Sequence, residues 1–286
     1  MITPSEFIHP EDAAALNALK SIPILSTMVK KVMDIGAEQL QTGLNMASKV
    51  KLSPSQLPRL YNILPPICER LEIKEPDFYL EMNPVPNAYA FGDTQTAITI
   101  TSALVDMMSE DELIGVVAHE CGHIACRHML YHTLAQVIAN ASGMFETLAK
   151  LAVPIHYALM YWQRKSELSC DRAAAYIVGP KATASMLARL AGGPKSITSE
   201  LNLEELAEQA DLYDAFCKNG LWNKTLQTYA VMDQDHPFTS VRVREMLKWT
   251  ESDEYRNLIR TYPTCPNCHN AIDSSWKFCQ HCGHKL

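Results

Sequence analysis

Apolar residues recur every three to four positions along most of this chain, which predicts a mainly helical protein. The pattern is clear over residues 16–50, and the segment KLSPSQLP (51–58) ends it with residues typical of turns. It returns over residues 134–162, where LAQVIANASGMFETLAKLAVPIHYALMYW predicts one or two amphipathic helices packed on the core. A peripheral contact of this segment with a membrane surface is the alternative. No apolar run reaches the roughly 18 residues expected of a membrane span.

Two short segments break the helical pattern and predict strands. They are DFYLEM (77–82) and TAITIT (96–101), and the second alternates apolar and polar residues. Ser109 followed by Glu112 forms a capping box, so we expect a helix from about Glu110 to Tyr131. The predicted fold class is therefore α+β: a mainly helical core with a small mixed β-sheet.

Composition and charge narrow the class of function. Of the 286 residues, 47% are hydrophobic and 20% are charged, as in an ordinary globular protein. The net charge is -7, from 25 basic and 32 acidic residues, and the basic residues are scattered, which argues against a nucleic-acid partner. The first residues lack the basic start and apolar core of a secretory signal. We therefore expect a cytoplasmic protein, with membrane association left open.

The segment VVAHECGHIACRH (116–128) carries the candidate chemistry of the predicted helix. His119 and His123 are four residues apart, so they project about 40° from one another and can bind the same metal ion. Glu120 lies about 100° round from His119, close enough to accept a proton from a water beside the metal without becoming a ligand. This is the H-E-x-x-H arrangement of zinc hydrolases. Cys121 faces away.

The other candidate ligands of this segment are Cys126 and His128. Cys126 returns to the side of His119 but lies about 10 Å along the helix axis, which makes a poor tetrahedron. We expect Cys126 to be a small buried residue instead. His128 points to the opposite side of a continuous helix and is expected at the surface.

A catalytic zinc needs a third protein ligand, and the best candidate lies in QRKSELSCDRAAAYIVG (163–179). Glu167 and Asp171 are four residues apart on a predicted helix. One carboxylate can bind zinc while the other orients a histidine ligand through its ring N–H. The alternative is an exposed helix face, because acidic pairs on helices are common.

These two segments together resemble the membrane-type gluzincin peptidases, the family of HtpX-like proteases and CAAX prenyl proteases. Their signature is H-E-x-x-H followed by E-x-x-x-D-R, matched here by Glu167, Asp171 and Arg172. The resemblance covers about residues 60–250 and implies that Glu167 is the third zinc ligand and Asp171 supports the site. Family members usually carry transmembrane helices, and none is evident in this sequence.

Two further segments agree with the resemblance. NAYAFG (87–92) is similar to the family's edge strand before the metal helix, where an extended substrate can add by backbone hydrogen bonds. Asn87, Ala88, Tyr89 and Ala90 are therefore the candidate substrate-binding residues; an ordinary hairpin is the alternative.

The second segment is DHPFTSVR (235–242), which matches the family's H-P-x-x-x-x-R pattern. The resemblance implies that His236 helps to stabilise the oxyanion and that Arg242 braces the carboxylates of the site. Without the resemblance, His-Pro followed by Thr239 and Ser240 is a helix start.

The C-terminal tail predicts a second metal site. Nine cysteines are present, and four of them form two C-x-x-C pairs with ten residues between the pairs: Cys265, Cys268, Cys279 and Cys282. Four thiolates in this arrangement form a closed structural zinc site, and the tail resembles a zinc ribbon. A redox C-x-x-C is the alternative, but no βαβ pattern surrounds either pair. The ribbon is a candidate surface for a protein partner.

These observations predict a zinc-dependent metalloendopeptidase that acts on protein or peptide substrates, with one catalytic and one structural zinc. The expected parts are an N-terminal helical segment (1–59), a metallopeptidase domain (60–258) and a zinc ribbon (262–286). A different class of function is a non-enzymatic holdase or adaptor that binds extended segments and keeps a dormant metal site.

Overall fold

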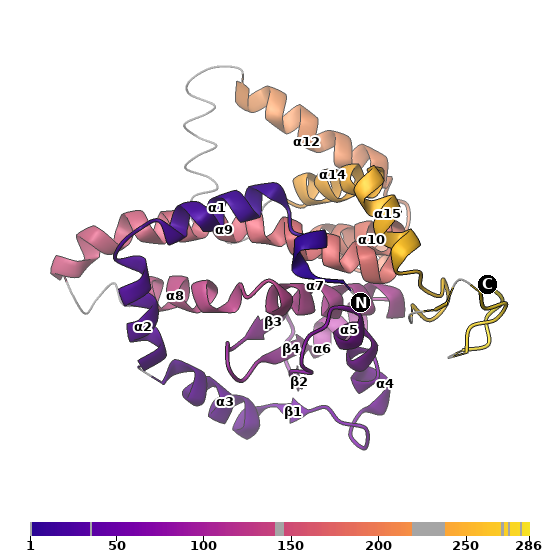
Figure 1. Cartoon of the computed structure of the whole chain (residues 1–286), viewed down its shortest axis with the longest axis horizontal. Helices are drawn as coiled ribbons and strands as arrows, with labels where there is room; N and C mark the ends of the chain where they lie inside the picture. The colour runs from indigo at the N-terminus through magenta and orange to yellow at the C-terminus, as the bar shows by residue number, and fades with distance from the viewer. Residues whose placement is uncertain are drawn as a thin grey trace.

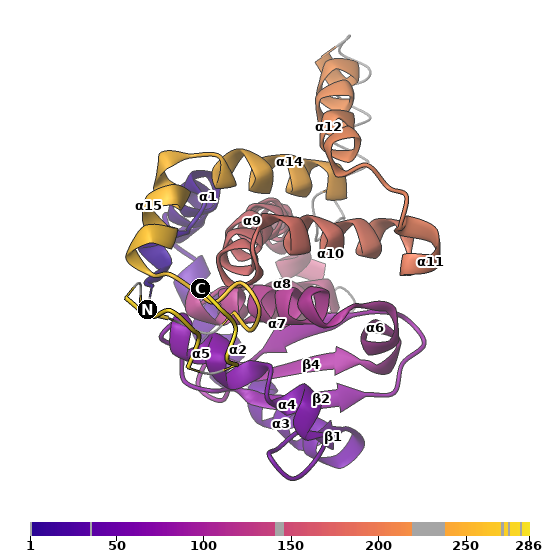
Figure 2. The same cartoon turned by 90° about the vertical axis from the view of Figure 1, so that its right-hand side faces the viewer.

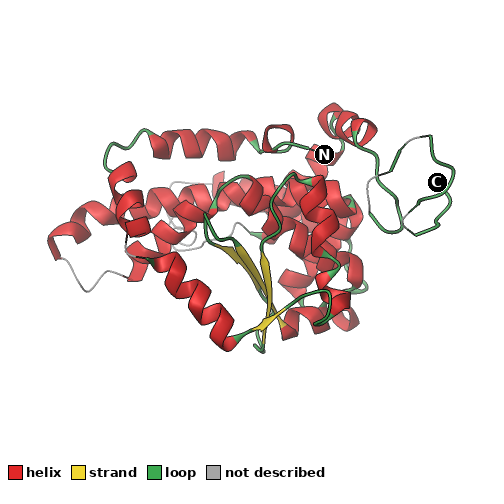
Figure 3. Cartoon of the chain, turned by 60° about the horizontal axis from the view of Figure 1, so that its bottom comes forward, coloured by secondary structure: helices red, strands yellow, loops and turns green. Residues whose placement is uncertain are grey.

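A four-stranded sheet lies at one side of a stack of helices in the computed structural model (Figure 1). The structure describes residues 2–34, 36–140, 146–218, 238–269, 272–273, 275–280 and 282–286. Helices dominate these ranges, and the strands gather in one sheet (Figure 3). The predicted α+β class is confirmed.

The sheet contains both parallel and antiparallel pairs. Its strands are β1 (Val50–Lys51), β2 (Asp77–Glu81), β3 (Ala88–Phe91) and β4 (Ala97–Thr101), in the order β1-β2-β4-β3. β2 and β4 are parallel, whereas β1 and β3 run antiparallel to their neighbours. Ile98 and Ile100 of TAITIT are fully buried in the main core, and the alternating Thr99 and Thr101 are buried as well, so β4 is covered on both faces. The mixed sheet was predicted; the short strand β1 was not.

The described ranges contain helices that differ widely in length. They are α1 (Pro10–Lys20), α2 (Leu25–Asp34), α3 (Ala37–Ser48), α4 (Pro58–Tyr61), α5 (Leu64–Arg70), α6 (Ser102–Met107), α7 (Glu110–Ala125), α8 (Met129–Asn140), α9 (Glu146–Val178), α10 (Pro180–Gly192), α11 (Lys195–Thr198), α12 (Leu203–Lys218), α14 (Thr239–Thr250) and α15 (Asp253–Thr261), with a 3-10 turn, η1, at Pro4–Glu6.

Helix α9 is the centre of the helical layers. It packs against α7 on one side and against α1, α10 and α14 on the others. Figure 2 shows α1 and α14 beyond α9 and the sheet beyond α7. Three consecutive alanines of α9, residues 173–175, are fully buried and keep this crossing close. The residues of α7 and α9 that carry chemistry therefore face each other inside the molecule.

The N-terminal segment is part of this packing. Ile2 and Phe7 are fully buried in the main core, and α1 lies along α9 (Figure 1). The domain boundary expected at residue 59 stays a prediction.

Residues 134–140 and 146–162 of the apolar segment lie in α8 and α9, as the helical spacing predicted. Leu134, Leu159 and Trp162 are buried in a second core cluster with Leu19 and Leu25 of α1 and α2. In the described ranges, no helix combines the length and the apolar character needed to cross a membrane.

Helix α7 is shorter than predicted. The capping box at its start is present, with Ser109 and Glu112 bonded reciprocally. Its last residue is Ala125 instead of Tyr131, because Arg127 adopts a left-handed conformation with a φ of 56°. The N–H of His128 donates to the carbonyl of His123, and that of Arg127 to the carbonyl of Ile124. This pair of bonds is a Schellman motif, which ends a helix and reverses the chain.

Candidate metal centre

Helices α7 and α9 bring the predicted metal-binding side chains together. His119 and His123 lie one turn apart on α7, with their ring centroids 5.0 Å apart. Glu167 on α9 faces both rings: its Oε2 is 3.3 Å from Nε2 of His119, and its Oε1 is 3.2 Å from Nε2 of His123. Two ligand atoms of a tetrahedral zinc with bonds of roughly 2.0–2.1 Å lie about 3.3 Å apart. These three side chains therefore fit a zinc ion.

A thiol stands beside the same side chains. Cys170, one turn after Glu167 on α9, places its Sγ within 4.8 Å of a ring nitrogen of each histidine. The sequence reasoning did not consider Cys170. Its Sγ also lies 3.7 Å from Nδ1 of His128. His128 contacts Nδ1 of His123, whereas Glu167 contacts Nε2 of the same ring. Glu167, at hydrogen-bonding distance from both Nε2 atoms, is better placed as the third ligand.

The close approach of α7 and α9 depends on Gly122. A Cβ at this position would lie 3.0 Å from Cβ of Ala173 and 3.1 Å from Cα of Cys170. Because the second contact involves backbone, a side chain at residue 122 would push α9 away. The glycine between the two histidines thus lets Glu167 reach them.

A buried carboxylate supports His119 from behind. Asp171 Oδ1 lies 3.1 Å from Nδ1 of His119, and Arg242 of α14 donates to both oxygens of Asp171 at 2.8 and 2.7 Å. Arg242 also lies 3.2 Å from Oε2 of Glu167. One guanidinium therefore holds both carboxylates of α9.

The charges around His119 shift its pKa. Burial lowers the pKa of His119, but the carboxylates of Glu167 and Asp171 outweigh burial and raise it to about 9. Burial raises the pKa of Asp171, and the Arg242 guanidinium more than reverses this shift, so that the pKa lies below its ordinary value. The centre is therefore a place where positive charge is stabilised.

Glu120 differs from the residues around it. Its side chain is 8% exposed, and it makes no hydrogen bond or ion pair with any residue of the described ranges. A carboxylate that no neighbour holds is free to accept a proton from a bound water.

The structure corrects the expectation for His128. It was predicted at the surface on the far side of a continuous helix; it is instead 0% exposed. The Schellman motif at Arg127 turns the chain back, so that Nδ1 of His128 lies 3.1 Å from Nδ1 of His123. Nε2 of His128 lies 3.1 Å from Asp12 of α1, which the sequence reasoning missed altogether. Cys121 is buried and Cys126, the C-cap of α7, is partly buried.

The candidate substrate residues lie on an edge strand. β3 pairs with β4 on one side, and no described strand pairs with its other side. The Thr101 N–H donates to the Asn87 carbonyl, so Asn87 and, two residues on, Tyr89 form the hydrogen-bonded pairs with β4. The backbone groups of Ala88 and Ala90 therefore point to the open edge. The same strand is one arm of a hairpin with β4, as the alternative predicted, and substrate binding at the open edge stays a prediction.

Other predicted residues have simpler positions. His236 lies outside the described residues. Arg172 donates to the carbonyl of Ile8 at 3.3 Å and stacks on Trp249. Burial lowers the pKa of Arg172 to about 10.

The four tail cysteines form a separate cluster. Sγ of Cys265 lies 3.7 Å from that of Cys282, and Sγ of Cys268 lies 3.5 Å from that of Cys279. Four thiolates on one zinc at roughly 2.3 Å have sulfur–sulfur distances of about 3.8 Å. The cluster therefore fits a tetrahedral zinc.

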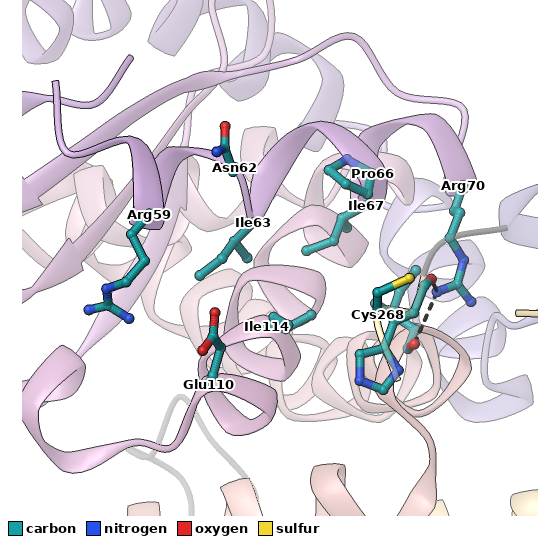
Figure 4. A pocket seen from close by; sticks show the side chains of 11 residues that line it. Arg59, Asn62, Ile63, Pro66, Ile67, Arg70, Glu110, Ile114 and Cys268 are labelled. Atoms are coloured by element: carbon teal, nitrogen blue, oxygen red, sulfur yellow. Dashed lines mark hydrogen bonds between the residues drawn. The ribbon is translucent and has the colours of Figure 1, made fainter. Parts of the chain in front are cut away.

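The tail docks on the body beside a pocket of about 140 Å³ between α5, α7 and the first cysteine pair (Figure 4). Arg70 of α5 donates to the carbonyls of Tyr176, Ile177 and His269, which joins the tail to the end of α9. His269 Nε2 lies 3.3 Å from Asp111 of α7.

The model of peptidase family M48 matches residues 54–250, more than half of the chain. The chain belongs to peptidase family M48. A zinc-ribbon domain matches residues 264–286 of the same chain. This M48 peptidase is accordingly a zinc metalloprotease that acts on protein substrates, with a catalytic zinc and a structural zinc in the cysteine cluster. The holdase or adaptor alternative is not favoured.

Relatives agree with the expected resemblance to HtpX-like proteases. The plastoglobule-localized metallopeptidase 48, chloroplastic, of Arabidopsis thaliana is 33% identical over 89% of this M48 chain and 75% of its own length. A protease HtpX homolog of Campylobacter concisus is 26% identical over 65% of this chain and 73% of its own. The crystal structure of S. mikatae Ste24p is similar with a TM-score of 0.41 and 14% identity, over 81% of this chain and 64% of that one.

Proposed function

We propose that this M48 protease is an endopeptidase that cleaves extended segments of protein substrates, with His119, His123 and Glu167 as the ligands of its catalytic zinc. The observation that carries the proposal is the convergence of both Nε2 atoms on the carboxylate of Glu167, at 3.2 and 3.3 Å. Two imidazoles and one carboxylate leave a fourth position of a tetrahedral zinc open for water or substrate.

Glu120 is the general base in this proposal. When bound, zinc acts as a Lewis acid that polarises the scissile carbonyl and lowers the pKa of water. Glu120 adjoins His119 in sequence and has no competing partner in the described part of the chain, so its carboxylate can take a proton from the attacking water. It then carries that proton to the leaving amine.

Asp171 and Arg242 are positioning residues. Asp171 accepts the Nδ1–H of His119 and thereby directs Nε2 towards the metal. Arg242 holds Asp171 and Glu167 in place through the contacts described above. Stabilisation of the oxyanion by His236 stays a prediction from the family resemblance.

Strand β3 is the proposed binding surface for substrate. Ala88 and Ala90 present backbone donors and acceptors to the open edge, where an extended peptide can pair as a further strand. Backbone pairing recognises extended conformation and tolerates many sequences. Unfolded or locally disordered segments are therefore the substrates that this site favours.

We propose a cytoplasmic location for the enzyme, with a peripheral membrane contact. The candidate surface for the contact is residues 134–162, where Tyr161 and Val153 of α9 are half-exposed although Leu134, Leu159 and Trp162 pack in the second core cluster. One relative is named as plastoglobule-localized. Cosedimentation with phosphatidylglycerol vesicles tests this contact, and protein that stays entirely in the supernatant contradicts it.

The experiment for the catalytic assignment is Glu120→Gln, with Glu110→Gln of the same helix as a matched control. We expect Glu120→Gln to keep both zinc ions by metal analysis and to cleave casein at least about 100-fold more slowly, because the general base is removed. Glu110→Gln should cleave like the parent. Equal cleavage by Glu120→Gln and the parent contradicts the assignment.

A further inference from the structure

A further buried histidine stands behind the proposed zinc ligands. His128 and Asp12 are both 0% exposed, and neither is needed to bind the metal or to move a proton. They lie in contact with each other and, through His128, with His123. We propose that Asp12 and His128 form a positioning relay for the zinc ligand His123, so that helix α1, which lies before the matched residues 54–250, completes the metal site. The proposal rests on His123 being a zinc ligand.

The first step of the relay is built by the end of α7. The left-handed Arg127 and the bond from the His128 N–H to the His123 carbonyl fold His128 back against the ring of His123. A left-handed conformation is unfavourable for a residue with a side chain, and glycine is the usual residue there. The chain thus adopts an unfavourable turn at the one place that brings the two rings together.

The second step is the position of the ring hydrogens of His123 and His128. Nε2 of His123 faces Glu167 and the metal side, so the hydrogen of a neutral ring sits on Nδ1. That Nδ1 lies 3.1 Å from Nδ1 of His128, which accepts the hydrogen. The remaining hydrogen of His128 is then on Nε2, which lies 3.1 Å from Oδ2 of Asp12 in an ion-pair contact whose geometry is too bent for a hydrogen bond.

The third step is the support of Asp12 itself. Trp162 Nε1 donates to its Oδ1 at 2.9 Å, and the hydroxyl of Ser169 donates to its Oδ2. The backbone N–H of His9 donates in turn to Ser169 Oγ at 2.9 Å. Donors from α9 therefore fix the carboxylate of Asp12, which belongs to α1. Burial of a carboxylate is costly unless the carboxylate accepts such bonds.

The relay gives the two zinc-binding histidines equivalent support. His119 contacts a buried carboxylate, Asp171, directly. His123 reaches the carboxylate of Asp12 through one intervening imidazole. A carboxylate behind a ligand histidine fixes its tautomer and ring orientation and increases its basicity, which strengthens metal binding.

Cys170 is the competing partner of His128. Its Sγ lies 3.7 Å from Nδ1 of His128, farther than the 3.1 Å to His123. If the thiol were the group that matters, its removal would weaken the metal site. Cys170→Ala is therefore the matched control, since it removes a buried neighbour of His128 and leaves the relay intact.

The experiment compares full-length zinc-loaded His128→Phe, Asp12→Asn and Cys170→Ala with the parent in competition with a graded zinc chelator. The affinity compared is that of the zinc ion that the His123→Ala variant lacks. We expect His128→Phe to bind it about 10- to 100-fold more weakly, as disruption of such support does elsewhere. Asp12→Asn should lose less, because it removes the charge beside His128 but keeps a polar side chain of the same size. Cys170→Ala should bind zinc within about twofold of the parent.

Further measurements separate positioning from folding. Circular dichroism of each chelator-treated variant shows whether the fold persists without metal, and His128→Asn, which keeps an acceptor opposite Nδ1 of His123, should regain most of the affinity. Cobalt substituted at the site should show shifted visible bands in His128→Phe and Asp12→Asn only. Parental affinity and bands in folded His128→Phe overturn the relay. Retention of both zinc ions by His123→Ala instead contradicts the ligand set under Proposed function.

Discussion

At the scale of single residues, several buried charges of the described ranges are paired across helices. Glu112 near the start of α7 is buried, and the Nε of Arg189 in α10 lies 2.6 and 2.7 Å from its two oxygens. Burial raises the pKa of Glu112, but the bonds from Arg189, Ser185 and Ser109 lower it by more, so the net shift is downward. The ionised carboxylate therefore stabilises the folded state.

We expect Glu112→Gln to lower the free energy of unfolding by about 3 kcal/mol near neutral pH, because Arg189 is left buried without its counter-ion. Since the folded pKa is below the unfolded one, this stability is present above about pH 4.3 and is lost as the pH falls towards the folded pKa. Urea unfolding of the parent and variant between pH 3 and pH 7 measures it. A difference that grows as the pH falls contradicts this sign.

The residues of the site differ in how much of the chain is needed to predict them from the sequence. His119, Glu120 and His123 could be predicted because helical periodicity alone places them on one side of α7. Glu167 and Asp171 needed the family pattern, since spacing could not distinguish them from an exposed acidic face. Asp12 carried no signal, because an acid in the first turn of an amphipathic helix is ordinary. Only the packing of α1 on α9 brings it within 3.1 Å of His128.

At the scale of elements, the end of α7 is where sequence reasoning failed. No glycine or proline marks residues 126–128, and the apolar pattern continues, so a longer helix was the natural prediction. The structure ends the helix with Arg127 in the left-handed region. The contacts that His128 gains in the core compensate for this conformation, and such long-range compensation is invisible to local patterns.

The edge strand β3 gives a test at the same scale. The N–H of Ala88 points away from β4, so Ala88→Pro removes a donor from the open edge without breaking the β3–β4 ladder. If substrate pairs with this edge, loss of one backbone bond of about 1 kcal/mol lowers kcat/KM for an extended peptide roughly fivefold. Steady-state cleavage of a fluorogenic peptide measures this change.

Ala88→Val is the matched control for that strand, because it changes the side chain and keeps the N–H. It should cleave like the parent. Circular dichroism and metal analysis establish that both variants are folded and loaded with zinc. If folded Ala88→Pro cleaves the peptide as fast as Ala88→Val, substrate does not pair at this position.

At the scale of the whole molecule, segments from both ends of the chain meet at α9. Helix α1 lies along it and brings Asp12 against His128, and α14 brings Arg242 against Asp171. The C-terminal cluster reaches the end of α9 through Arg70, whose guanidinium donates to Tyr176, Ile177 and His269. The family motifs predicted the two metal sites, but a lead-in helix in the sequence gave no sign that it would support one of them.

This arrangement predicts that the two zinc sites can be emptied separately. The cysteine cluster holds its metal with four sulfurs of the tail, and the described contacts of the tail with the body include those of His269 with Arg70 and with Asp111, eight residues before His119 on α7. Cys265→Ser should therefore leave one zinc per chain and keep catalysis, because the tail unfolds without its metal while the core of α7 and α9 persists. His119→Ala should also leave one zinc, now in the tail, and should abolish cleavage. Metal analysis by mass spectrometry, with casein cleavage on the same samples, distinguishes the two. Loss of both ions from Cys265→Ser contradicts separate sites and would make the tail part of the catalytic fold.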